Sequence, residues 1–393
     1  MIKRFRIQNY KALRDVTLEL TPLHVLIGPN DSGKTSILEA IAALCRSVDH
    51  PLTQAFTGSW EGLQLVWLGK RDLAISLTAS VDHENEKVDY HLSCSSAPNR
   101  RTMKIETEWV QLTAESRPTQ IEAKQDVCSK VYRVAFEGQH APDDLQTRAT
   151  LVYDSLVGIQ SYRWDGRFLA LPVAPDAKRR FRMEPSGFGL ALLLDDILGF
   201  DRDLFSRLEQ RFKKIFPDVK SIKLIPEPAY KSPVDDPEQI PMLGKSDGKG
   251  LYFEFEGGGE PIPARQVSDG VLLVLAYLAV LHLPEPPRVL LIEEPENGIH
   301  PKRLQDVLSI LRELVGEQSQ TQVVLTTHSP YVVDLFQPEE VTLCSKEEDG
   351  AISVRRLSQS KTVQDQLDVF TLGEIWTAEG DNALVQPVAS EGE

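Results

Sequence analysis

The sequence is poor in the residues that build disulfide frameworks and cysteine zinc sites. Its 393 residues include only four cysteines, at positions 45, 94, 128 and 344, and no two of them form a C-x-x-C pair. This scattering excludes the usual sequence patterns of both kinds of site. We therefore expect Cys45, Cys94, Cys128 and Cys344 to be reduced and structural.

Long apolar runs are also missing. No stretch reaches the roughly 18 apolar residues of a membrane span. The longest run, residues 271–283, is interrupted by Tyr277 and His282 and predicts a buried helix. The N-terminus passes directly into a strand pattern without the apolar core of a signal peptide. We therefore expect a cytoplasmic protein that has no membrane partner.

An overall basic excess is absent as well, because the net charge is −15. This charge argues against a protein coated in basic surface for tight, non-specific nucleic-acid binding. Residues 334–393 hold 13 acidic and 4 basic residues, so the rest of the chain is only mildly acidic. Two local basic groups could contact DNA or RNA phosphates or could be solvated charged faces. They are the run KRRFR at 178–182 and the cluster of Lys3, Arg4, Arg6, Lys11 and Arg14.

A glycine-rich segment at residues 28–36, GPNDSGKTS, matches the phosphate-loop pattern G-x-x-x-x-G-K-[ST]. Residues 24–27 predict a buried strand before it, and residues 35–48 show helical apolar spacing after it. Backbone N–H groups can surround phosphate oxygens only where no Cβ intrudes, and a helix N-terminus adds partial positive charge. The segment predicts ATP binding, with Lys34 at the β- and γ-phosphates and Thr35 at Mg²⁺.

Two apolar runs predict parallel strands that end in polar residues. Residues 289–292 precede Glu293 and Glu294, and residues 323–325 precede a TTHSP segment that contains His328. The carboxyl ends of such strands meet at the edge of the sheet where ligands bind. We expect the two carboxylates and the histidine at that edge.

Helical spacing between the two strands, at residues 304–314, predicts the crossover helix. A further segment, VSDG at 267–270, opens the apolar run described above. Ser268 and Gly270 could form an anion-binding helix start, or Ser268 could be an ordinary N-cap.

The rest of the chain predicts antiparallel strands, then helices, then loops. Alternating apolar residues mark strands at 16–20 and, between 62 and 137, at Leu73/Ile75/Leu77, Val88/Tyr90/Leu92 and Tyr132/Val134/Phe136. Residues 204–216 form a helical stripe that ends at Pro217. The proline- and acid-rich residues 226–241 and the glycine-rich residues up to 259 predict linkers or surface loops.

Four motifs in this order, GPNDSGKTS, VSDG, LLIEEPENGIHP (290–301) and TTHSP (326–330), resemble the ABC-type ATPases of the SMC, RecF and OLD (overcoming lysogenization defect) group. The similarity is greatest to stand-alone bacterial ATPases of the OLD-like type. It implies an α/β fold: a P-loop ABC-type head with an antiparallel β section and an inserted α-helical subdomain. The expected segments are 1–170 (N-terminal head and β-rich lobe), 171–245 (mainly α-helical insertion), 246–345 (C-terminal head) and 346–393 (acidic tail).

The resemblance also implies roles for particular residues. Glu294 falls on the carboxylate that polarises the attacking water, and His328 on the switch histidine near the γ-phosphate. Glu293 falls where many relatives have the Asp associated with Mg²⁺. Ser268 and Gly270 would contact the γ-phosphate of ATP bound to a second copy. The phosphates and Mg²⁺ would be held by the residues of the glycine-rich loop, namely Gly28, Asn30, Asp31, Ser32, Gly33, Lys34, Thr35 and Ser36.

Some features depart from the group's usual pattern. Glutamate at 293 moves the carboxylate outward by one methylene, and the signature is Ser-Asp-Gly where transporters have Ser-Gly-Gly. The glutamine loop has one candidate, Gln160.

The resemblance also implies a dimer-interface loop. It contains Glu296, Asn297 and His300, on the loop that relatives use across the dimer interface.

The leading function is ATP hydrolysis in a homodimer or higher even-numbered oligomer that clamps nucleic acid or controls a separate effector. The resemblance implies anti-phage defence or DNA repair as the setting, with a nuclease or toxin as the effector and DNA as a further candidate partner. We expect no Toprim nuclease after Ser329. The alternative is a slowly hydrolysing, ATP-dependent scaffold that restrains a partner toxin or nuclease. The long insertion and the unusual signature argue against a transporter subunit.

Overall fold

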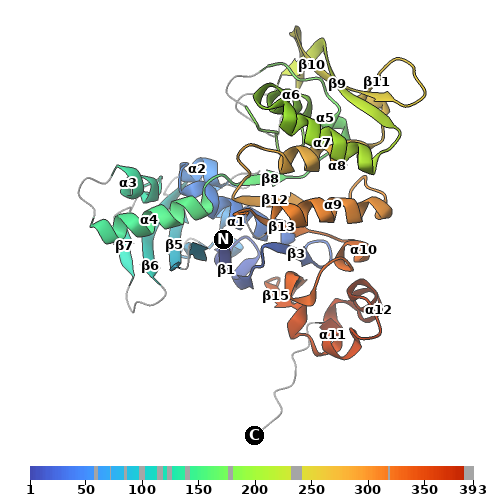
Figure 1. The fold of residues 1–393 in the computed structure, drawn as a ribbon. Coiled ribbons are helices and arrows are strands. Elements are labelled where there is room, and N and C mark those ends of the chain that lie inside the picture. The colour runs from blue at the N-terminus through green and yellow to red at the C-terminus, as the bar shows by residue number, and fades with distance from the viewer. Residues whose placement is uncertain are drawn as a thin grey trace. The chain divides into compact units, whose positions relative to one another are not determined.

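The computed structural model describes residues 1–56, 61–70, 72–83, 86–96, 102–112, 118–121, 126–137, 142–175, 180–231, 241–316 and 319–384. These residues form two compact units (Figure 1). Unit 1 comprises residues 1–160, 287–291 and 320–393, and unit 2 comprises residues 161–286 and 292–319. The four segments expected from the sequence stay a prediction.

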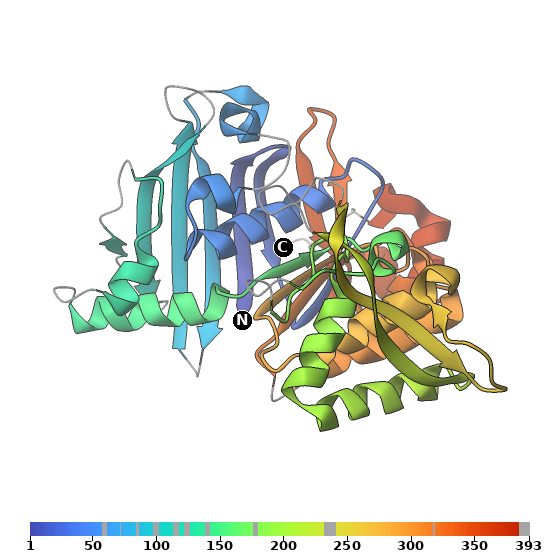
Figure 2. The same ribbon diagram turned by 90° about the horizontal axis from the view of Figure 1, so that it is seen from above.

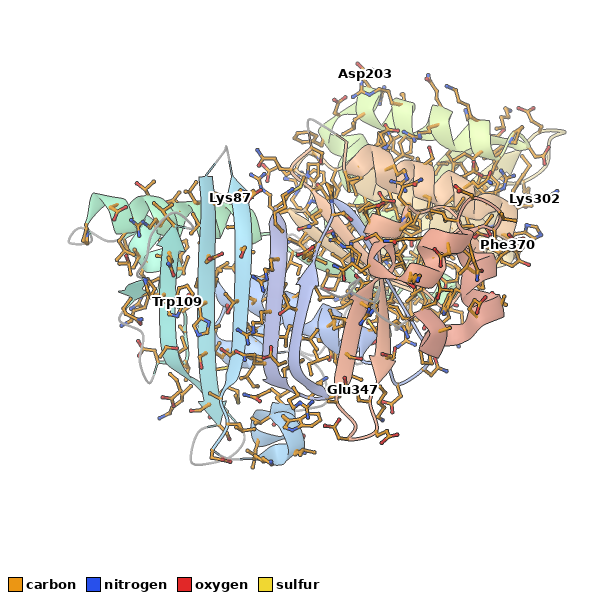
Figure 3. All side chains as sticks on the ribbon, turned by 90° about the horizontal axis from the view of Figure 1, so that it is seen from below. Lys87, Trp109, Asp203, Lys302, Glu347 and Phe370 are labelled. Atoms are coloured by element: carbon orange, nitrogen blue, oxygen red, sulfur yellow. The ribbon has the colours of Figure 1, made fainter. Side chains whose placement is uncertain are left out.

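An antiparallel sheet in unit 1 has the strand order β2-β1-β4-β5-β6-β7. Helices α1 and α4 cover one of its faces (Figure 2). The other face is polar, and Figure 3 looks onto it, with Trp109 labelled on β6. This sheet confirms the antiparallel section expected from the sequence. The elements are β1 (Ile2–Tyr10), β2 (Leu13–Glu19), β4 (Ile75–His83), β5 (Glu86–Ser96), β6 (Met103–Leu112), β7 (Thr119–Ile121), α1 (Lys34–Ser47), α2 (Leu52–Ala55), α3 (Val131–Phe136) and α4 (Asp143–Leu156).

The strand predicted at Tyr132, Val134 and Phe136 is wrong, because these residues lie in helix α3. Buried positions in α3 are Val131 and Ala135, which are four residues apart as in a helix. Tyr132 and Phe136 are partly exposed on the neighbouring face of α3 and pack on each other with ring centroids 5.3 Å apart. The alternation seen in the sequence is therefore not an alternation of burial.

The second six-stranded sheet has the order β15-β14-β3-β13-β12-β8. Strands β14 and β13 both pair in parallel with β3, as expected for a buried nucleotide-binding sheet. The boundary between the two units falls within β8 and β12. The strands are β3 (Leu23–Ile27), β8 (Gln160–Tyr162), β12 (Val289–Glu293), β13 (Gln322–Thr326), β14 (Val341–Lys346) and β15 (Ile352–Arg356).

Short helices complete the described part of unit 1. They are α10 (Pro330–Val333), α11 (Lys361–Gln366) and α12 (Leu372–Leu384), with 3-10 turns at Gly62–Leu65, Trp67–Gly69, Pro338–Glu340 and Leu357–Gln359. In α12, Leu372 and Ile375 are buried, so this part of the acidic tail packs against the unit. Gly373 N donates a hydrogen bond of 2.7 Å to Asp334 Oδ1 beside α10.

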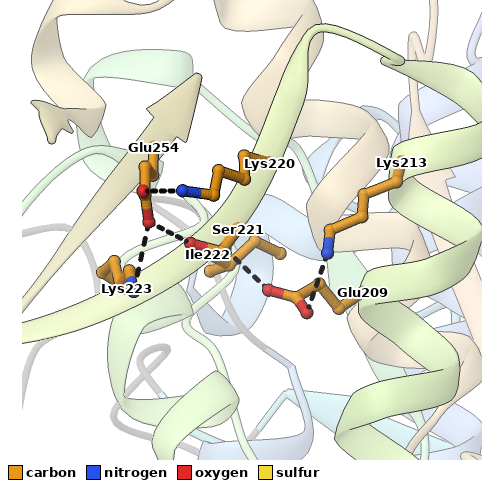
Figure 4. Close-up of polar contacts among 7 residues, drawn as sticks. All are labelled: Glu209, Lys213, Lys220, Ser221, Ile222, Lys223 and Glu254. Atoms are coloured by element: carbon orange, nitrogen blue, oxygen red, sulfur yellow. Dashed lines mark hydrogen bonds and ion pairs between the residues drawn. The ribbon is translucent and has the colours of Figure 1, made fainter. Parts of the chain in front are cut away.

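Helices and a three-stranded sheet form unit 2. Asp201 caps α7, accepting hydrogen bonds from the backbone N–H groups of Asp203 and Leu204, and the apolar stripe of α7 is buried. Glu209 on α7 accepts a 2.7 Å bond from Ile222 N of β9 (Figure 4). The elements are α5 (Gly166–Leu169), α6 (Leu190–Phe200), α7 (Arg202–Ile215), β9 (Val219–Lys231), β10 (Met242–Phe255), β11 (Ile262–Pro263), a 3-10 turn (Ala264–Gln266), α8 (Asp269–Leu281) and α9 (Pro301–Leu314).

The prediction of linkers or loops at residues 226–241 and up to 259 is wrong for the residues of β9 and β10, while residues 232–240 lie outside the described part. Pro226 and Pro228 fit because β9 is an edge strand, where a missing N–H is tolerated. Gly248 fits because a Cβ there would lie 2.2 Å from the Val173 carbonyl oxygen. Proline and glycine therefore mark an edge and a close approach in this sheet.

Among the described residues, no helix combines the length and the apolar character needed to cross a membrane.

Candidate functional site

The glycine-rich loop joins β3 to α1 in unit 1. All five residues of β3 are buried, and Gly28 follows with φ 136°, while Gly33 precedes α1 with φ 81°. A Cβ at Gly28 would lie 2.2 Å from the Cys344 carbonyl oxygen, and one at Gly33 would lie 2.8 Å from Ile352 Cγ1. Both glycines are therefore required by backbone conformation and by the close approach of β14 and β15.

The amine of Lys34 lies inside the loop. Its Nζ donates hydrogen bonds to the carbonyl oxygens of Gly28 (2.9 Å) and Pro29 (2.7 Å) and to Ser32 Oγ (3.3 Å). Lys34 and Ser32 are buried, whereas Asn30 is exposed. The cation is thus held where the sequence predicts nucleotide phosphates.

The start of α1 suits an anion. Thr35 is exposed, Ser36 is half-buried, and the first turn of α1, which is described throughout, contains no acidic residue. The partial positive charge of the helix N-terminus is therefore not neutralised within its own first turn.

Asp31 adopts φ 64°, a left-handed conformation that is uncommon for residues other than glycine. Its carboxylate forms an ion pair with Lys346 at the end of β14. This contact joins the loop to a strand more than 300 positions away, and the motif alone did not predict it. Lys346 therefore belongs to the surroundings of the loop.

The structure brings His328 to the same sheet edge as the loop. Thr326 of β13 pairs with Leu26 of β3, and Thr327 N donates a 3.1 Å bond to the Leu26 carbonyl oxygen. His328 follows and is half-buried, and Ser329 N donates a 3.0 Å bond to Thr327 Oγ1. The expected position of His328 at the carboxyl edge of this sheet is confirmed.

Two carboxylates follow the apolar run of β12, as the sequence predicts. Glu293 is half-buried, with its Oε2 4.0 Å from Arg163 Nη1. Glu294 is also half-buried and adopts φ 49°. Asn297 Nδ2 donates a 2.6 Å hydrogen bond to Glu294 Oε2, so Asn297 orients that carboxylate. Left-handed backbone at a residue other than glycine occurs preferentially at active sites.

The signature segment lies at the start of α8 in unit 2. Ser268 is the exposed N-cap residue, and its side chain makes no capping hydrogen bond within the described part of the chain. A Cβ at Gly270 would lie 3.3 Å from the Gly298 carbonyl oxygen. The ordinary side-chain N-cap, which was the alternative for Ser268, is therefore not formed here.

The described residues contain no group of three or more His, Cys, Asp or Glu side chains placed to hold a metal ion without other ligands. Gln160 is half-buried in β8, and its predicted glutamine-loop role stays a prediction.

Two protein-family models match the chain. Residues 1–134 match a model described as "AAA ATPase domain", and residues 164–334 match one described as "AAA domain, putative AbiEii toxin, Type IV TA system". Together they span the glycine-rich loop, the signature, the carboxylates and the histidine.

Two curated proteins are similar over most of the chain. An OLD nuclease of Thermus scotoductus is 23% identical over 401 residues, covering 95% of this chain and 68% of that relative. An ATP/GTP phosphatase of Helicobacter pylori is 19% identical over 379 residues, covering 90% of this chain and 95% of that relative.

Solved structures support the fold. An SMC head bound to the C-winged helix domain of ScpA matches with a TM-score of 0.53 at 15% identity, covering 90% of this chain and 97% of that one. An SMC head with an extended coiled coil, bound to the C-terminal domain of ScpA derived from Pyrococcus furiosus, matches with a TM-score of 0.51 at 13% identity, covering 93% and 99%.

The site and the fold define a P-loop ATPase with an ABC-type head. Within that class, the chain is similar in sequence to an OLD nuclease and to an ATP/GTP phosphatase, and similar in fold to SMC heads.

Proposed function

We propose that this ATPase hydrolyses ATP with Mg²⁺ at a composite site between two heads. The observation that supports this most is Glu294, which follows a buried strand, adopts a left-handed backbone and is oriented by Asn297. A carboxylate fixed in this way can accept a hydrogen bond from an attacking water and hold it in line with the γ-phosphate.

The glycine-rich loop supplies the positive groups that phosphoryl transfer needs. Lys34 would exchange its bonds to the Gly28 and Pro29 carbonyl oxygens for bonds to phosphate oxygens. Thr35 and Glu293 would hold Mg²⁺, which neutralises charge on the β- and γ-phosphates when bound. His328, at the same sheet edge as the loop, would sense the γ-phosphate.

The second head would supply the signature. Ser268 is exposed at a helix N-terminus and is not engaged as a side-chain cap, so its hydroxyl can reach an anion on another molecule. The resemblance to SMC and OLD proteins supports the proposal that this group contacts the partner's ATP. The proposed assembly is therefore a homodimer, or a larger even-numbered oligomer, that closes on ATP.

The dimer would use ATP to clamp nucleic acid or to control a separate nuclease or toxin, in bacterial anti-phage defence or DNA repair. The family description naming a putative AbiEii toxin and the similarity to an OLD nuclease support this setting. We propose the cytoplasm as the location of this activity, because ATP and these partners are found there.

Steady-state ATP hydrolysis and light scattering test the proposal. Lys34→Ala is expected to reduce hydrolysis to background, because it removes the cation at the phosphates. Glu294→Gln is expected to stop hydrolysis yet accumulate an ATP-bound dimer, since binding groups are intact. Lys214→Ala, at an exposed lysine on α7, is the matched control and keeps the wild-type rate. A Lys34→Ala protein that hydrolyses ATP at the wild-type rate would refute the site, and full cellular function of Glu294→Gln would favour the scaffold alternative.

A further inference from the structure

Basic and aromatic side chains lie close together in unit 2, where the turn at residues 180–182 packs against α6, the helix labelled in Figure 1. The turn contributes Arg180, Phe181 and Arg182, and α6 contributes its last residue, Phe200; we call these four residues the Arg/Phe surface. The rings of Phe181 and Phe200 lie edge to face, with centroids 5.5 Å apart. The Arg180 guanidinium carbon lies 5.6 Å from the Phe181 ring centroid. Both arginines are exposed, and Phe200 is 58% exposed.

The turn is held in an unusual conformation. Phe181 adopts φ 55°, which is an outlier for a bulky side chain. Its backbone N–H donates a 2.9 Å hydrogen bond to Asp196 Oδ2 on α6. Helix α6 thus fixes the turn through a carboxylate and through the Phe200 ring. Such strain persists only where surrounding contacts over-determine it, so the Arg/Phe surface is pre-organised.

The two arginines of the Arg/Phe surface are not held in ion pairs by carboxylates among the described residues. Elsewhere in unit 2, Lys220 and Lys223 both pair with Glu254, at 2.7 Å and 3.2 Å (Figure 4). Arg180 and Arg182, by contrast, form no ion pair within the part of the chain that the structure describes. Their guanidinium groups therefore remain available to an anion.

The carboxylates closest to the surface along α6 are engaged in other contacts. Asp196 accepts the Phe181 N–H, and Asp195 Oδ1 lies 3.4 Å from Lys249 Nζ. Asp201, next to Phe200, accepts the first N–H groups of α7. Among the described residues, only Asp195 of these three acids is paired with a cation, and none of them forms an ion pair with Arg180 or Arg182. The two guanidinium groups therefore keep their own charge for an anion.

We propose that the Arg/Phe surface binds single-stranded nucleic acid. The exposed ring of Phe200 and the half-buried ring of Phe181 offer stacking surfaces for unpaired bases, and the guanidinium groups bind phosphates. This combination is typical of sequence-tolerant strand binding. A duplex hides its base faces, and an acidic peptide would use the arginines but not the rings. Because the protein has a net charge of −15, it repels nucleic acid over most of its surface. Binding of a nucleic-acid strand is therefore confined to locally basic surface. Residues 178 and 179 of the basic run lie outside the described residues and are not part of this surface.

This inference shares one premise with the proposed function, namely that the ATPase dimer clamps nucleic acid. The test is fluorescence anisotropy of labelled DNA and RNA single strands of about 20 nucleotides, longer than typical 4–16-nucleotide sites, with a duplex of the same length as a third probe. Titrations are run without ATP and at several salt concentrations. The affinities for the DNA and RNA probes decide whether the surface binds single-stranded DNA, single-stranded RNA or both.

Single strands of one or both kinds are expected to bind more tightly than the duplex. Phe200→Ala is expected to weaken binding about tenfold through lost stacking. Arg180→Ala with Arg182→Ala should reduce the slope of log affinity against log salt by roughly 0.7 per cation removed. Phe181→Asn removes the ring while keeping a residue that tolerates the left-handed turn, and it should weaken binding with an unchanged melting temperature.

Lys214→Ala is the control for loss of an exposed cation in the same unit and should bind like the wild type. Lys34→Ala should lose ATP hydrolysis but keep strand binding without ATP, so failure of the ATPase site and failure of this surface are separable. Strand affinity and salt slope unchanged in the Phe200 and arginine variants would overturn the inference. So would wild-type protein that binds the duplex or a poly-glutamate peptide but not single strands.

Discussion

Acidification should destabilise the protein through His24, a histidine buried in β3. Its Nε2 lies 2.9 Å from Thr342 Oγ1 and its Nδ1 lies 3.1 Å from Thr21 Oγ1, so the neutral ring bridges two hydroxyl groups. Burial, with a smaller effect of Arg356, lowers the pKa of His24 from 6.5 to about 3. Protonation in the folded protein would place an uncompensated charge beside the strand that leads into the phosphate loop.

The direction follows from proton linkage. Between pH 6.5 and about 3 the unfolded chain protonates His24 while the folded protein does not, so stability that is present above pH 6.5 is lost as the pH falls. Between pH 7.5 and 5.5 the expected loss from this residue is about 1.4 kcal/mol. A His24→Gln variant lacks this titration but keeps a polar side chain near the two threonines.

Guanidinium unfolding at pH 7.5 and 5.5 measures the effect. Groups other than residue 24 titrate alike in both proteins, so the difference between the two pH-dependent changes isolates His24. The wild type is expected to lose about 1.4 kcal/mol more than His24→Gln on acidification. Equal losses in the two proteins would refute the reasoning about the buried neutral ring.

Three further predictions concern the site. Gly28→Ala would place a Cβ 2.2 Å from the carbonyl oxygen of Cys344 in β14. The affinity for ATP, measured by calorimetry, should therefore fall at least tenfold. An affinity equal to that of the wild type would contradict this close packing. Lys346→Ala removes the ion pair to Asp31 and should raise KM for ATP about twofold with kcat kept, from the roughly 0.5 kcal/mol typical of exposed pairs. An unchanged KM would show that the pair does not position the loop. Asn297→Ala frees the carboxylate of Glu294 and should lower kcat about tenfold at unchanged ATP affinity, whereas a change in affinity alone would contradict a positioning role.

The phosphate loop could be predicted from the sequence because its chemistry depends on local spacing. Gly28 and Gly33 need backbone conformations and close approaches that only glycine accepts, and Lys34 follows at a fixed position. The placement of His328 was predictable for a related reason. A buried apolar strand ends where polar residues follow it in the sequence. Parallel strands have their carboxyl ends at the same edge of the sheet, so the polar residues that follow them meet there.

Contacts that depend on distant parts of the chain could not be predicted in this way. The ion pair of Asp31 with Lys346 joins residues more than 300 positions apart. The helix α3 was mistaken for a strand because its alternating aromatic residues are the exposed ones, whereas burial follows Val131 and Ala135. Pro226 in β9 suggested a loop because the sequence does not reveal that β9 is an edge strand.

Mixing two inactive variants tests the composite site most directly. Lys34→Ala lacks the phosphate cation but keeps Ser268, and Ser268→Arg keeps Lys34 but blocks the signature. Each is expected to be inactive alone, yet a mixed dimer contains one site with both groups intact. With random exchange, half of the dimers are mixed and each has one working site of two, so about a quarter of the wild-type hydrolysis rate should return on mixing. A mixture of exchanging dimers that stays as inactive as its components would contradict ATP hydrolysis at a site shared between two heads.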